Sequence, residues 1–344
     1  MKKILVSFLA IGQSLGITWT RIGCDDAWLA DHIDAQGGPM TIDPDAVWAN
    51  AVALSKGARE AIASLSGYKP FPREARKNAG ASANFIWNTE FAAHRGLASS
   101  SEGDMDEVTS VYRDIESALA GTLQVSTAQP GYLFCGGREL TKDRVPGIRD
   151  DPVWYATVTE AGEGGRLGTT DYIIPRVFEG AQTKPCKEEG SQAYFGKTFY
   201  GKKAGSGPEE EILGIVLCPN HFKTAGLRGY ATLDEGYATE AMNGNKKPYV
   251  AYYHSLSGTL LHDMVHVVGH ARDPRPPPAG GYHDKASGFR DQYKLARGVP
   301  TDPSGNPDKA AHEQMLHNPD GYRLFAEMCR SPDTAWGYPD APPA

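Results

Sequence analysis

The segment His262-Asp263-Met264-Val265-His266 constrains this chain more than any other part of its sequence. It lies within Ser257–Val268, where apolar residues recur at the spacing that predicts a helix. Two histidines four residues apart on a helix share one face, with about 6 Å between their Cβ atoms. Both imidazoles can then reach one metal ion. The alternative, two ordinary histidines on a helix face, is less favoured because an acidic residue follows the first one directly.

The segment differs by one residue from the H-E-x-x-H motif of zinc peptidases, in which the glutamate is the general base. Here the second position is Asp263. Its shorter side chain withdraws the carboxylate by one C–C bond, about 1.5 Å. Misplacing a catalytic group by about 1 Å can cost on the order of 100-fold in rate. The motif therefore predicts a peptidase-type metal site and, at the same time, a slow or inactive enzyme.

A hydrolytic zinc site takes three protein ligands and leaves one position for water. Metzincins place the third ligand where this chain has Arg272, and His270 comes two residues too early, so that pattern is rejected. Thermolysin-like enzymes use a glutamate from a later helix, for which Glu313 and Glu327 are candidates. The third option is an aspartate, Asp284, and the sequence around it favours this residue.

Four segments carry a resemblance to a known family. Gly281-Tyr282-His283-Asp284-Lys285-Ala286-Ser287-Gly288 resembles the G-T-x-D-x-x-Y-G segment of the deuterolysin (aspzincin) family of secreted fungal zinc metallopeptidases. Asn318-Pro319-Asp320-Gly321-Tyr322-Arg323-Leu324-Phe325-Ala326 resembles the family's N-A-D-x-Y-x-L-F/Y-A helix. Gly214-Ile215-Val216-Leu217-Cys218-Pro219 is similar to the strand before its active-site helix, and Leu260-Leu261-His262 to the entry into its motif.

The resemblance covers roughly residues 186–330 and implies one zinc ion held by His262, His266 and Asp284. It implies that Asp263 occupies the position of the general base. Ser287 stands where the family has a tyrosine that is a candidate to stabilise the oxyanion, and Tyr282 stands where it has threonine. Tyr282 or His283 could replace that tyrosine in contacting the oxyanion or substrate.

Three functions follow as expectations. The leading one is a zinc-dependent endopeptidase that hydrolyses protein or peptide substrates, with activity reduced by Asp263. The alternative is a catalytically inactive pseudo-peptidase that acts as a secreted binding or effector protein. A structural metal site in an unrelated secreted protein is more remote. The net charge of −7 gives no indication of a nucleic-acid partner.

The N-terminus predicts export. Met1-Lys2-Lys3 precedes the short apolar run Ile4–Ile11, a pattern typical of a secretory signal peptide, and cleavage is expected near Gly16. The alternative is a buried first strand. No later segment is apolar enough to predict a membrane span. We therefore expect a secreted, extracellular protein.

The chain has five cysteines, which in a secreted protein predict two disulfides and one remaining thiol. Cys186 and Cys218 are the favoured pair. Closing that loop would add about 3–4 kcal/mol on the chain-entropy model. The pairing of Cys24, Cys135 and Cys329 stays open.

The element pattern predicts an α+β fold, which the resemblance makes zincin-like: a helical N-terminal part, a small mixed sheet, the zinc-binding helix and C-terminal helices. Helices are expected at 43–66, 104–120, 257–268, 284–297, 307–317 and 319–330, and strands at 123–135, 153–159, 172–178 and 212–218. Residues 99–103 and 201–207 are expected to be loops, and Gly269 to end the zinc helix. The expected division is a signal peptide (1–16), a mainly helical region that could be a removable pro-segment (17–150), a metallopeptidase domain (151–334) and a flexible tail (335–344).

Overall fold

The computed structural model describes residues 16–24, 43–70, 72–123, 130–137, 139–160, 169–176, 186, 195–205, 209–218, 229–230, 232–233, 254–274, 281–298 and 311–332. The expected signal peptide and tail lie outside these residues, apart from Gly16. Within the described ranges the helices are α2 (Pro44–Leu65), α3 (Glu74–Trp87), α4 (Ser99–Leu119), α7 (Leu256–Arg272), α8 (Gly288–Ala296), α9 (Ala311–Leu316) and α10 (Pro319–Arg330). The expected α+β class is confirmed.

One large sheet accounts for most of the strand structure. Its order is β1 (Thr18–Ile22), β4 (Pro130–Cys135), β9 (Glu210–Leu217), β8 (Gly196–Ala204), β7 (Thr169–Pro175), β6 (Arg149–Glu160) and β5 (Thr141–Val145). The first three strands are parallel and the others pair antiparallel, so the sheet is mixed, as expected. With seven strands it is larger than the small sheet that the sequence predicts. Two short pairs stand apart, β2 (Phe91–Ala92) with β3 (Gly96–Leu97), and β10 (Gly229–Tyr230) with β11 (His254–Ser255).

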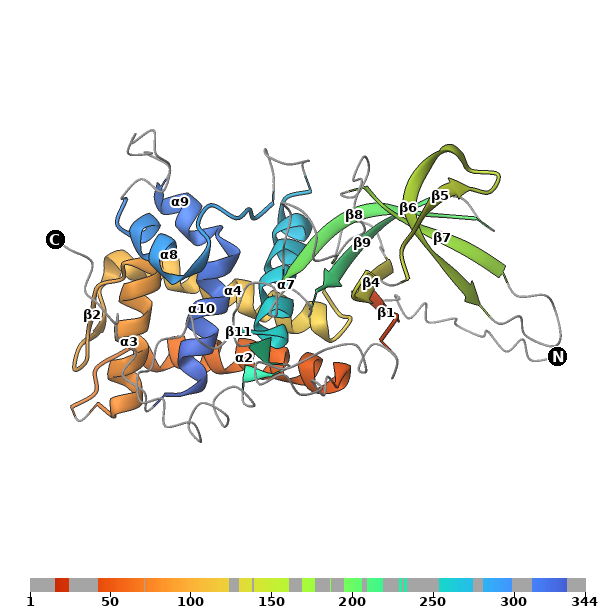
Figure 1. The fold of residues 1–344 in the computed structure, drawn as a ribbon. Helices are drawn as coiled ribbons and strands as arrows, with labels where there is room; N and C mark the ends of the chain where they lie inside the picture. Colours follow the sequence, from red (N-terminus) through yellow and green to blue (C-terminus); the bar gives the residue numbers. More distant parts are fainter. Residues whose placement is uncertain are drawn as a thin grey trace, which may run out of the picture.

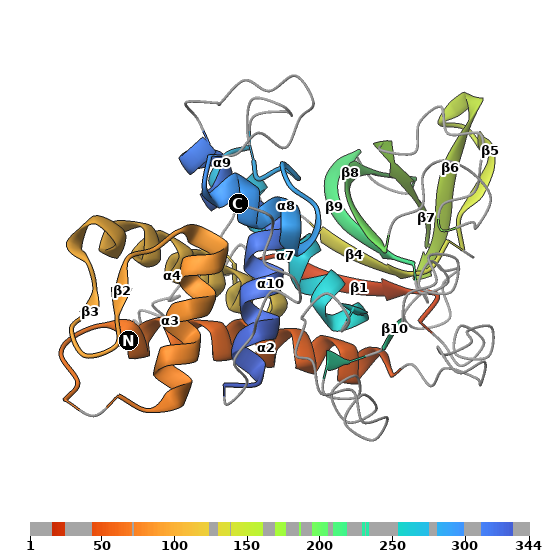
Figure 2. The ribbon, with the colours of Figure 1, turned by 60° about the vertical axis from the view of Figure 1, so that its left-hand side comes forward.

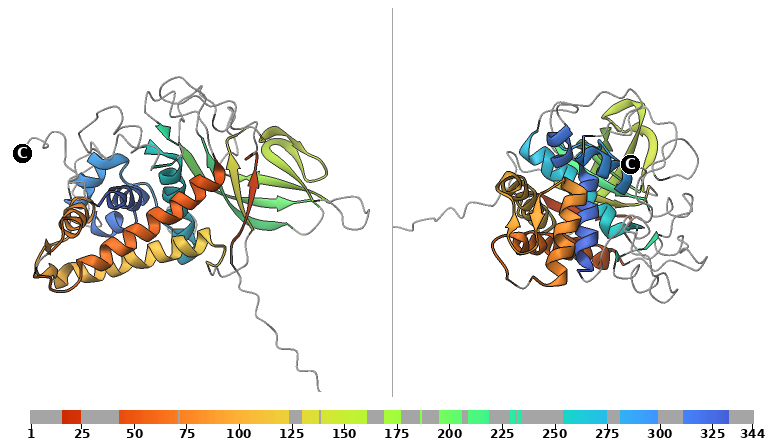
Figure 3. Two further views of the ribbon diagram at one scale, coloured as in Figure 1. Left: turned by 90° about the horizontal axis from the view of Figure 1, so that it is seen from below. Right: turned by 90° about the vertical axis from the view of Figure 1, so that its left-hand side faces the viewer.

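The helices gather at one end of the molecule and the sheet at the other, with α7 between them (Figure 1). The long helices α2 and α4 run side by side beneath this arrangement, and α10 passes close to both (Figure 3). The sheet curls away from the helices toward β5 and β6 (Figure 2). One apolar core joins residues of α2, α3, α4, α7 and α10 to one face of β4 and β9. Helix α7, which carries His262 and His266, is therefore central to the fold.

Helix α4 corrects one expectation. It begins at Ser99, so the prediction of a loop at residues 99–103 was wrong. Serine is a weak helix former that favours the first turn, where its side chain can bond to nearby backbone. Ser101 is buried and its hydroxyl accepts a hydrogen bond from the backbone N–H of Glu90 at 3.0 Å. This contact with the preceding chain stabilises a first turn that the local composition does not predict.

Helix α7 is longer than expected. The Ser255 hydroxyl caps it by accepting from the N–H of Gly258 at 2.9 Å. The helix then continues through Gly269, so the prediction that this glycine ends it was wrong. A Cβ at Gly269 would lie only 2.5 Å from the backbone nitrogen of Tyr282. Gly269 therefore does not end the helix. It leaves room for the segment that contains Tyr282 to pass close to α7.

Strand β8 occupies part of the second segment that was expected to be a loop. It extends to Ala204 and includes Gly201, so a loop over residues 201–204 was wrong, while residues 206–208 lie outside the described ranges. A Cβ on Gly201 would meet the carbonyl oxygen of Ile174 on β7 at 2.3 Å. Glycine is needed here for the close strand pairing.

The helix expected at 284–297 begins only at Gly288, because residues 281–287 run as irregular chain past α7.

Two disulfides are present in the described part of the chain. Cys186–Cys218 is confirmed, and the open pairing resolves as Cys24–Cys135, which leaves Cys329 free. Disulfides are typical of proteins in oxidising compartments. Among the described helices, none has both the length and the apolar character needed to cross a membrane.

The expected boundary at residue 150 falls inside β6. Strands β1 and β4 precede that boundary and pair, through β4, with β9 beyond it. Helices α2 and α4 also contribute to the core around α7. In the structure, residues on the two sides of position 150 thus build one sheet and one core.

Candidate metal centre

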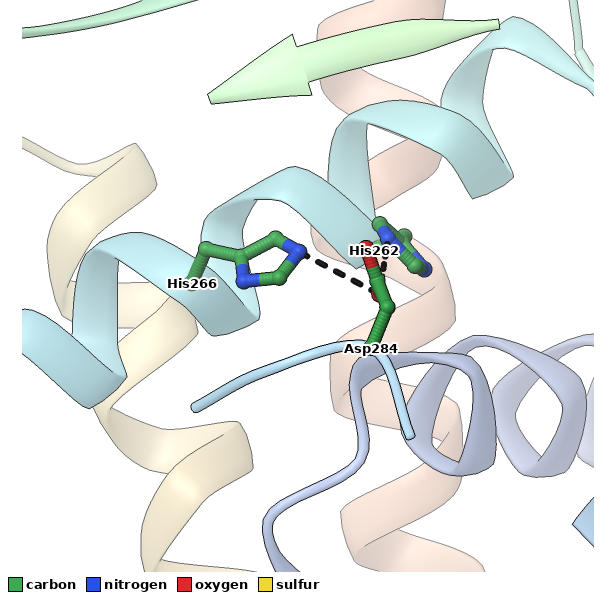
Figure 4. Close-up of side chains that lie close together, drawn as sticks. All are labelled: His262, His266 and Asp284. Carbon is green, nitrogen blue, oxygen red and sulfur yellow. Dashed lines mark ion pairs between the residues drawn. The ribbon is translucent and has the colours of Figure 1, made fainter. Parts of the chain in front are cut away.

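Three side chains converge on one point beside α7. His262 and His266 project from adjacent turns of this helix, and Asp284 approaches from the chain that crosses it (Figure 4). Oδ1 of Asp284 lies 3.1 Å from Nε2 of His262 and 3.4 Å from Nε2 of His266. One ligand atom from each residue lies within 4.8 Å of the others. Among the described residues, these three form the one group of His, Cys, Asp or Glu side chains that could share an ion.

The spacing of these atoms is compatible with one shared metal ion. Zinc binds imidazole nitrogen and carboxylate oxygen at about 2.0–2.2 Å, so ligands at tetrahedral positions lie about 3.4 Å apart. The two distances to Asp284 match that separation. The side chains are 20%, 16% and 50% exposed for His262, His266 and Asp284. Three ligands and an accessible side are typical of hydrolytic sites, whereas structural zinc sites are closed by four.

The two imidazoles are oriented by bonds at their other ring nitrogen. Nδ1 of His262 lies 3.0 Å from Oδ1 of Asp320, and Nδ1 of His266 lies 2.7 Å from the carbonyl oxygen of Tyr282. With Nδ1 donating in each ring, Nε2 is the nitrogen that faces Asp284, and it can bind a metal once it carries no proton. Metal-binding histidines are usually held in this way by a carboxylate or a carbonyl. These bonds therefore turn Nε2 of both rings toward Asp284.

The charges of the group stabilise one another. Burial raises the pKa of Asp284, but its hydrogen bonds to His262 and His266 outweigh burial and hold that pKa below its usual value. Burial lowers the pKa of His262, whereas its bonds to Asp284 and Asp320 raise it to about 10. In the metal-free protein a proton on His262 thus occupies part of the place that an ion would take. A metal must displace that proton in order to bind.

Behind His262 lies a chain of buried charges on α10. Nε of Arg323 donates to Oδ1 of Asp320 at 3.1 Å, and its Nη1 donates to Oε2 of Glu327 at 2.9 Å. All three residues are at most 6% exposed. Burial raises the pKa of Asp320, but the charges of Arg323 and His262 more than compensate and lower it. The carboxylate that orients His262 is therefore kept ionised by a buried guanidinium.

The two C-terminal segments that resemble the deuterolysin family contact each other. The side chain of Asn318 accepts from the N–H groups of Lys285 at 2.8 Å and Ala286 at 3.2 Å, and donates to the carbonyl of Ala286. Asp320 accepts from the N–H of Gly288 through its second oxygen. The start of α10 therefore holds the segment that carries Asp284, while its Asp320 also orients His262.

Asp263 points away from the ligands, toward β8. It is 2% exposed, and its Oδ1 accepts from the hydroxyl of Thr198 at 2.8 Å. Its Oδ2 has no hydrogen-bond partner among the described residues and lies against Gly196, where a Cβ would come within 2.2 Å of it. Burial raises the pKa of Asp263, although the nearby His262 and His266 oppose the change. A raised pKa makes a carboxylate a better proton acceptor near neutral pH.

The three residues considered for oxyanion or substrate contacts are found in different settings. Tyr282 is 6% exposed, and its hydroxyl is near Arg272 and Glu107. His283 is half-buried, and its Nε2 has no partner in the described part of the chain. Ser287 is exposed at the N-cap position of α8. The hydroxyls of Tyr282 and Ser287 therefore make no direct contact with the side chains of His262, His266 and Asp284.

The other candidate ligands lie outside the group of three and have other contacts. Glu327 bonds to Arg323, and Glu313 is exposed on α9; neither belongs to the group of three. His270 packs against Tyr200, with ring centroids 4.3 Å apart and planes tilted by 45°, and burial lowers the pKa of His270. Sequence reasoning assigned no role to Thr198 or Asp320. The one signal for Asp320 is its place in the Asn318–Ala326 segment, which resembles a family motif.

Comparison with known proteins adds no relative: no family model, curated protein or solved structure matches this chain.

Proposed function

We propose that this chain is a secreted zinc endopeptidase of the zincin type, related to the deuterolysins. The observation that carries the proposal is the set His262, His266 and Asp284, which offers two oriented imidazoles and one carboxylate with an accessible side. The contact between the two C-terminal motif segments supports the proposal, because Asn318 holds the backbone next to Asp284 and Asp320 orients His262. The two disulfides support export.

A zinc ion bound there would act as a Lewis acid toward a peptide carbonyl and lower the pKa of water. The chain's own part is to hold the ligands and to move a proton. Asp263, whose pKa burial raises, is the proposed acceptor of that proton and its donor to the leaving amine. To act in this way its carboxylate must exchange its bond with Thr198 for one with water.

The edge of β8 is the proposed binding surface for a peptide substrate. Pairing with β7 starts at Gly201, so Gly196–Tyr200 pairs only with β9 among the described strands. An extended peptide can add to such an edge through backbone hydrogen bonds. Thr198 and Gly196, on this half-strand, contact Asp263. A peptide bound there would lie beside the proposed proton acceptor.

A second candidate is a zinc-binding protein without catalysis. It is favoured by one observation, the burial of Asp263 together with its bond to Thr198. A carboxylate so engaged stabilises the packing of α7 on β8. Ligands and base are separate requirements, so metal binding would survive without hydrolysis.

The decisive experiment compares hydrolysis of a denatured protein by the zinc-loaded chain with that by its Asp263→Glu and Asp263→Asn variants. The proposal expects chelator-sensitive cleavage by the unmodified chain and none by the Asn variant, which keeps the shape of the side chain. Cleavage by the Glu variant alone would establish the second candidate, an intact scaffold with a disabled base. A chain that binds no zinc at all would exclude both.

A further inference from the structure

Tyr282 joins three parts of the fold next to the metal ligands. It belongs to the segment that carries Asp284, and it packs against Gly269 of α7, where any Cβ would come within 2.7 Å of the tyrosine side chain. Its ring stacks on that of His317, with centroids 4.5 Å apart and planes 17° from parallel. The side chain is thus enclosed between α7 and the turn after α9. Its position depends on a glycine that leaves room for it.

The hydroxyl of Tyr282 is bound through two routes to α4. Nη1 of Arg272 donates to it at 3.3 Å, and the guanidinium of Arg272 also donates to Asp114 at 2.7 and 2.9 Å. The hydroxyl itself lies 3.5 Å from Oε1 of Glu107. Figure 1 shows α4 beside α7, so these bonds cross between neighbouring helices. Residues before position 150 therefore hold a residue of the metal-binding segment.

His317 completes the arrangement. Its Nε2 lies 3.3 Å from the same Oε1 of Glu107. The carboxylate of Glu107 therefore contacts the hydroxyl of the tyrosine and the ring that stacks on it. One side chain of α4 thus constrains both partners of the stack.

The backbone of Tyr282 connects this arrangement to the metal ligands. Its carbonyl oxygen accepts from Nδ1 of His266 at 2.7 Å, and the ligand Asp284 follows two residues later. A rotation of the tyrosine or a shift of its backbone would move the partner of one ligand and the position of another. Partners of this kind typically change metal affinity by about 10–100-fold when they are lost.

We infer that Tyr282, anchored to α4 by Glu107 and by Arg272 with Asp114, is the positioning residue that fixes His266 and Asp284 for metal binding. This inference rests on the metal site of the proposed function but not on hydrolysis. Helix α4 then helps to position the metal ligands, although it contributes none of them. Residues 17–150, which include α4, accordingly stay with the metal-binding form of the protein and are not removed as a pro-segment.

The test replaces Tyr282 in the full chain and measures metal binding directly. The Tyr282→Thr variant keeps the backbone carbonyl and loses every side-chain anchor, while Tyr282→Phe keeps the ring stack and loses only the hydroxyl bonds. Zinc affinity is measured by competition with a chromophoric chelator, and ligand geometry by the visible absorption of bound Co²⁺. We expect zinc affinity to fall 10–100-fold in the Thr variant and several-fold in the Phe variant, with an altered Co²⁺ band in the Thr variant.

One control and one further test variant make the result decisive. Glu102→Gln, on the exposed side of α4, should leave zinc affinity and the Co²⁺ band unchanged. Asp114→Asn tests the anchor from α4 without touching the tyrosine, and it decides the matter if Tyr282→Thr fails to fold; it should weaken zinc binding several-fold. A folded Thr variant, or a folded Asn variant in its place, with the zinc affinity and Co²⁺ band of the unmodified chain would overturn the inference. An unmodified chain that binds neither metal would instead refute the proposed metal site, and one that binds zinc without hydrolysis would leave the positioning role intact.

Discussion

Nδ1 of His262 lies 3.0 Å from Oδ1 of Asp320, a residue 58 positions later in the chain. This contact joins a proposed ligand on α7 to the buried charges of α10. Asp320 also accepts from Arg323 and from the N–H of Gly288. One carboxylate therefore fixes both the orientation of the His262 ring and the position of the start of α8. The site is thus supported by a helix that contributes no ligand.

Replacing Asp320 by asparagine should weaken zinc binding about 10–100-fold, because His262 loses its carboxylate partner. The asparagine has the same shape, so the loss reports charge and not packing. Zinc affinity measured by chelator competition checks this expectation. Glu313→Gln, a change of an exposed carboxylate on α9, is the matched control and should have no effect. An Asp320→Asn variant that folds and binds zinc normally would show that the His262 contact does not matter.

Zinc binding should become tighter as the pH rises toward about 10. Bonds to Asp284 and Asp320 raise the pKa of His262 to about 10 against the effect of burial, so the metal-free ring holds a proton at neutral pH. Zinc must displace this proton, and affinity therefore increases until the ring is neutral. Calorimetry in buffers of different ionisation enthalpy should detect the released proton at pH 7. Affinity that does not change between pH 6 and pH 9 would contradict the assignment of His262 as a ligand.

Replacing Thr198 by valine should destabilise the fold without affecting the metal. The change removes the hydroxyl that donates to Oδ1 of Asp263 and leaves a buried carboxylate without that bond. Such a loss costs about 1–3 kcal/mol of unfolding free energy. Urea unfolding at pH 7 measures it, with Thr198→Ser as the control that retains the hydroxyl. Equal stability of the valine and serine variants would mean that the bond contributes nothing.

Helix α2 should stabilise the start of α7 through Asn50. Its Oδ1 accepts from the hydroxyl of Ser257 at 2.8 Å and from the N–H of Leu233 at 3.2 Å, and both side chains of the first pair are buried. Asn50→Ala should lower the unfolding free energy by about 1–3 kcal/mol, because buried donors lose their acceptor. Ser257→Ala removes the same bond from the other side. The double variant should therefore cost less than the sum of the two single changes, and strict additivity would show that the two residues do not interact.

The sequence predicts the elements whose pattern is local. The apolar spacing of Ser257–Val268 predicts α7, because a helix that packs on a core places apolar residues at a fixed period. Helix α10 is also predicted, although it buries every residue from Pro319 to Met328 and not one face alone. The ligand group also follows from short segments, since His262 and His266 share a helix face and the pattern around Asp284 identifies the third residue.

Contacts between distant residues leave no such pattern. The bond from Thr198 to Asp263 spans 65 positions, and that from Glu107 to Tyr282 spans 175. The same limit applies to Gly269, where glycine has two physical uses. The sequence suggests the commoner one, the end of a helix, whereas the structure uses it to admit Tyr282. Only the packing of α7 against the crossing segment distinguishes these two uses.

The disulfide between Cys24 and Cys135 closes a covalent ring of chain that contains α2, α3 and α4. On the chain-entropy model, a loop of about 100 residues closed in this way stabilises the fold by about 4.7 kcal/mol. A protease that cuts once anywhere inside the ring opens it without releasing a fragment. Nicked and intact molecules would then migrate alike until a reductant is added. The helices beside the candidate metal site are thus retained for as long as the disulfide stays oxidised.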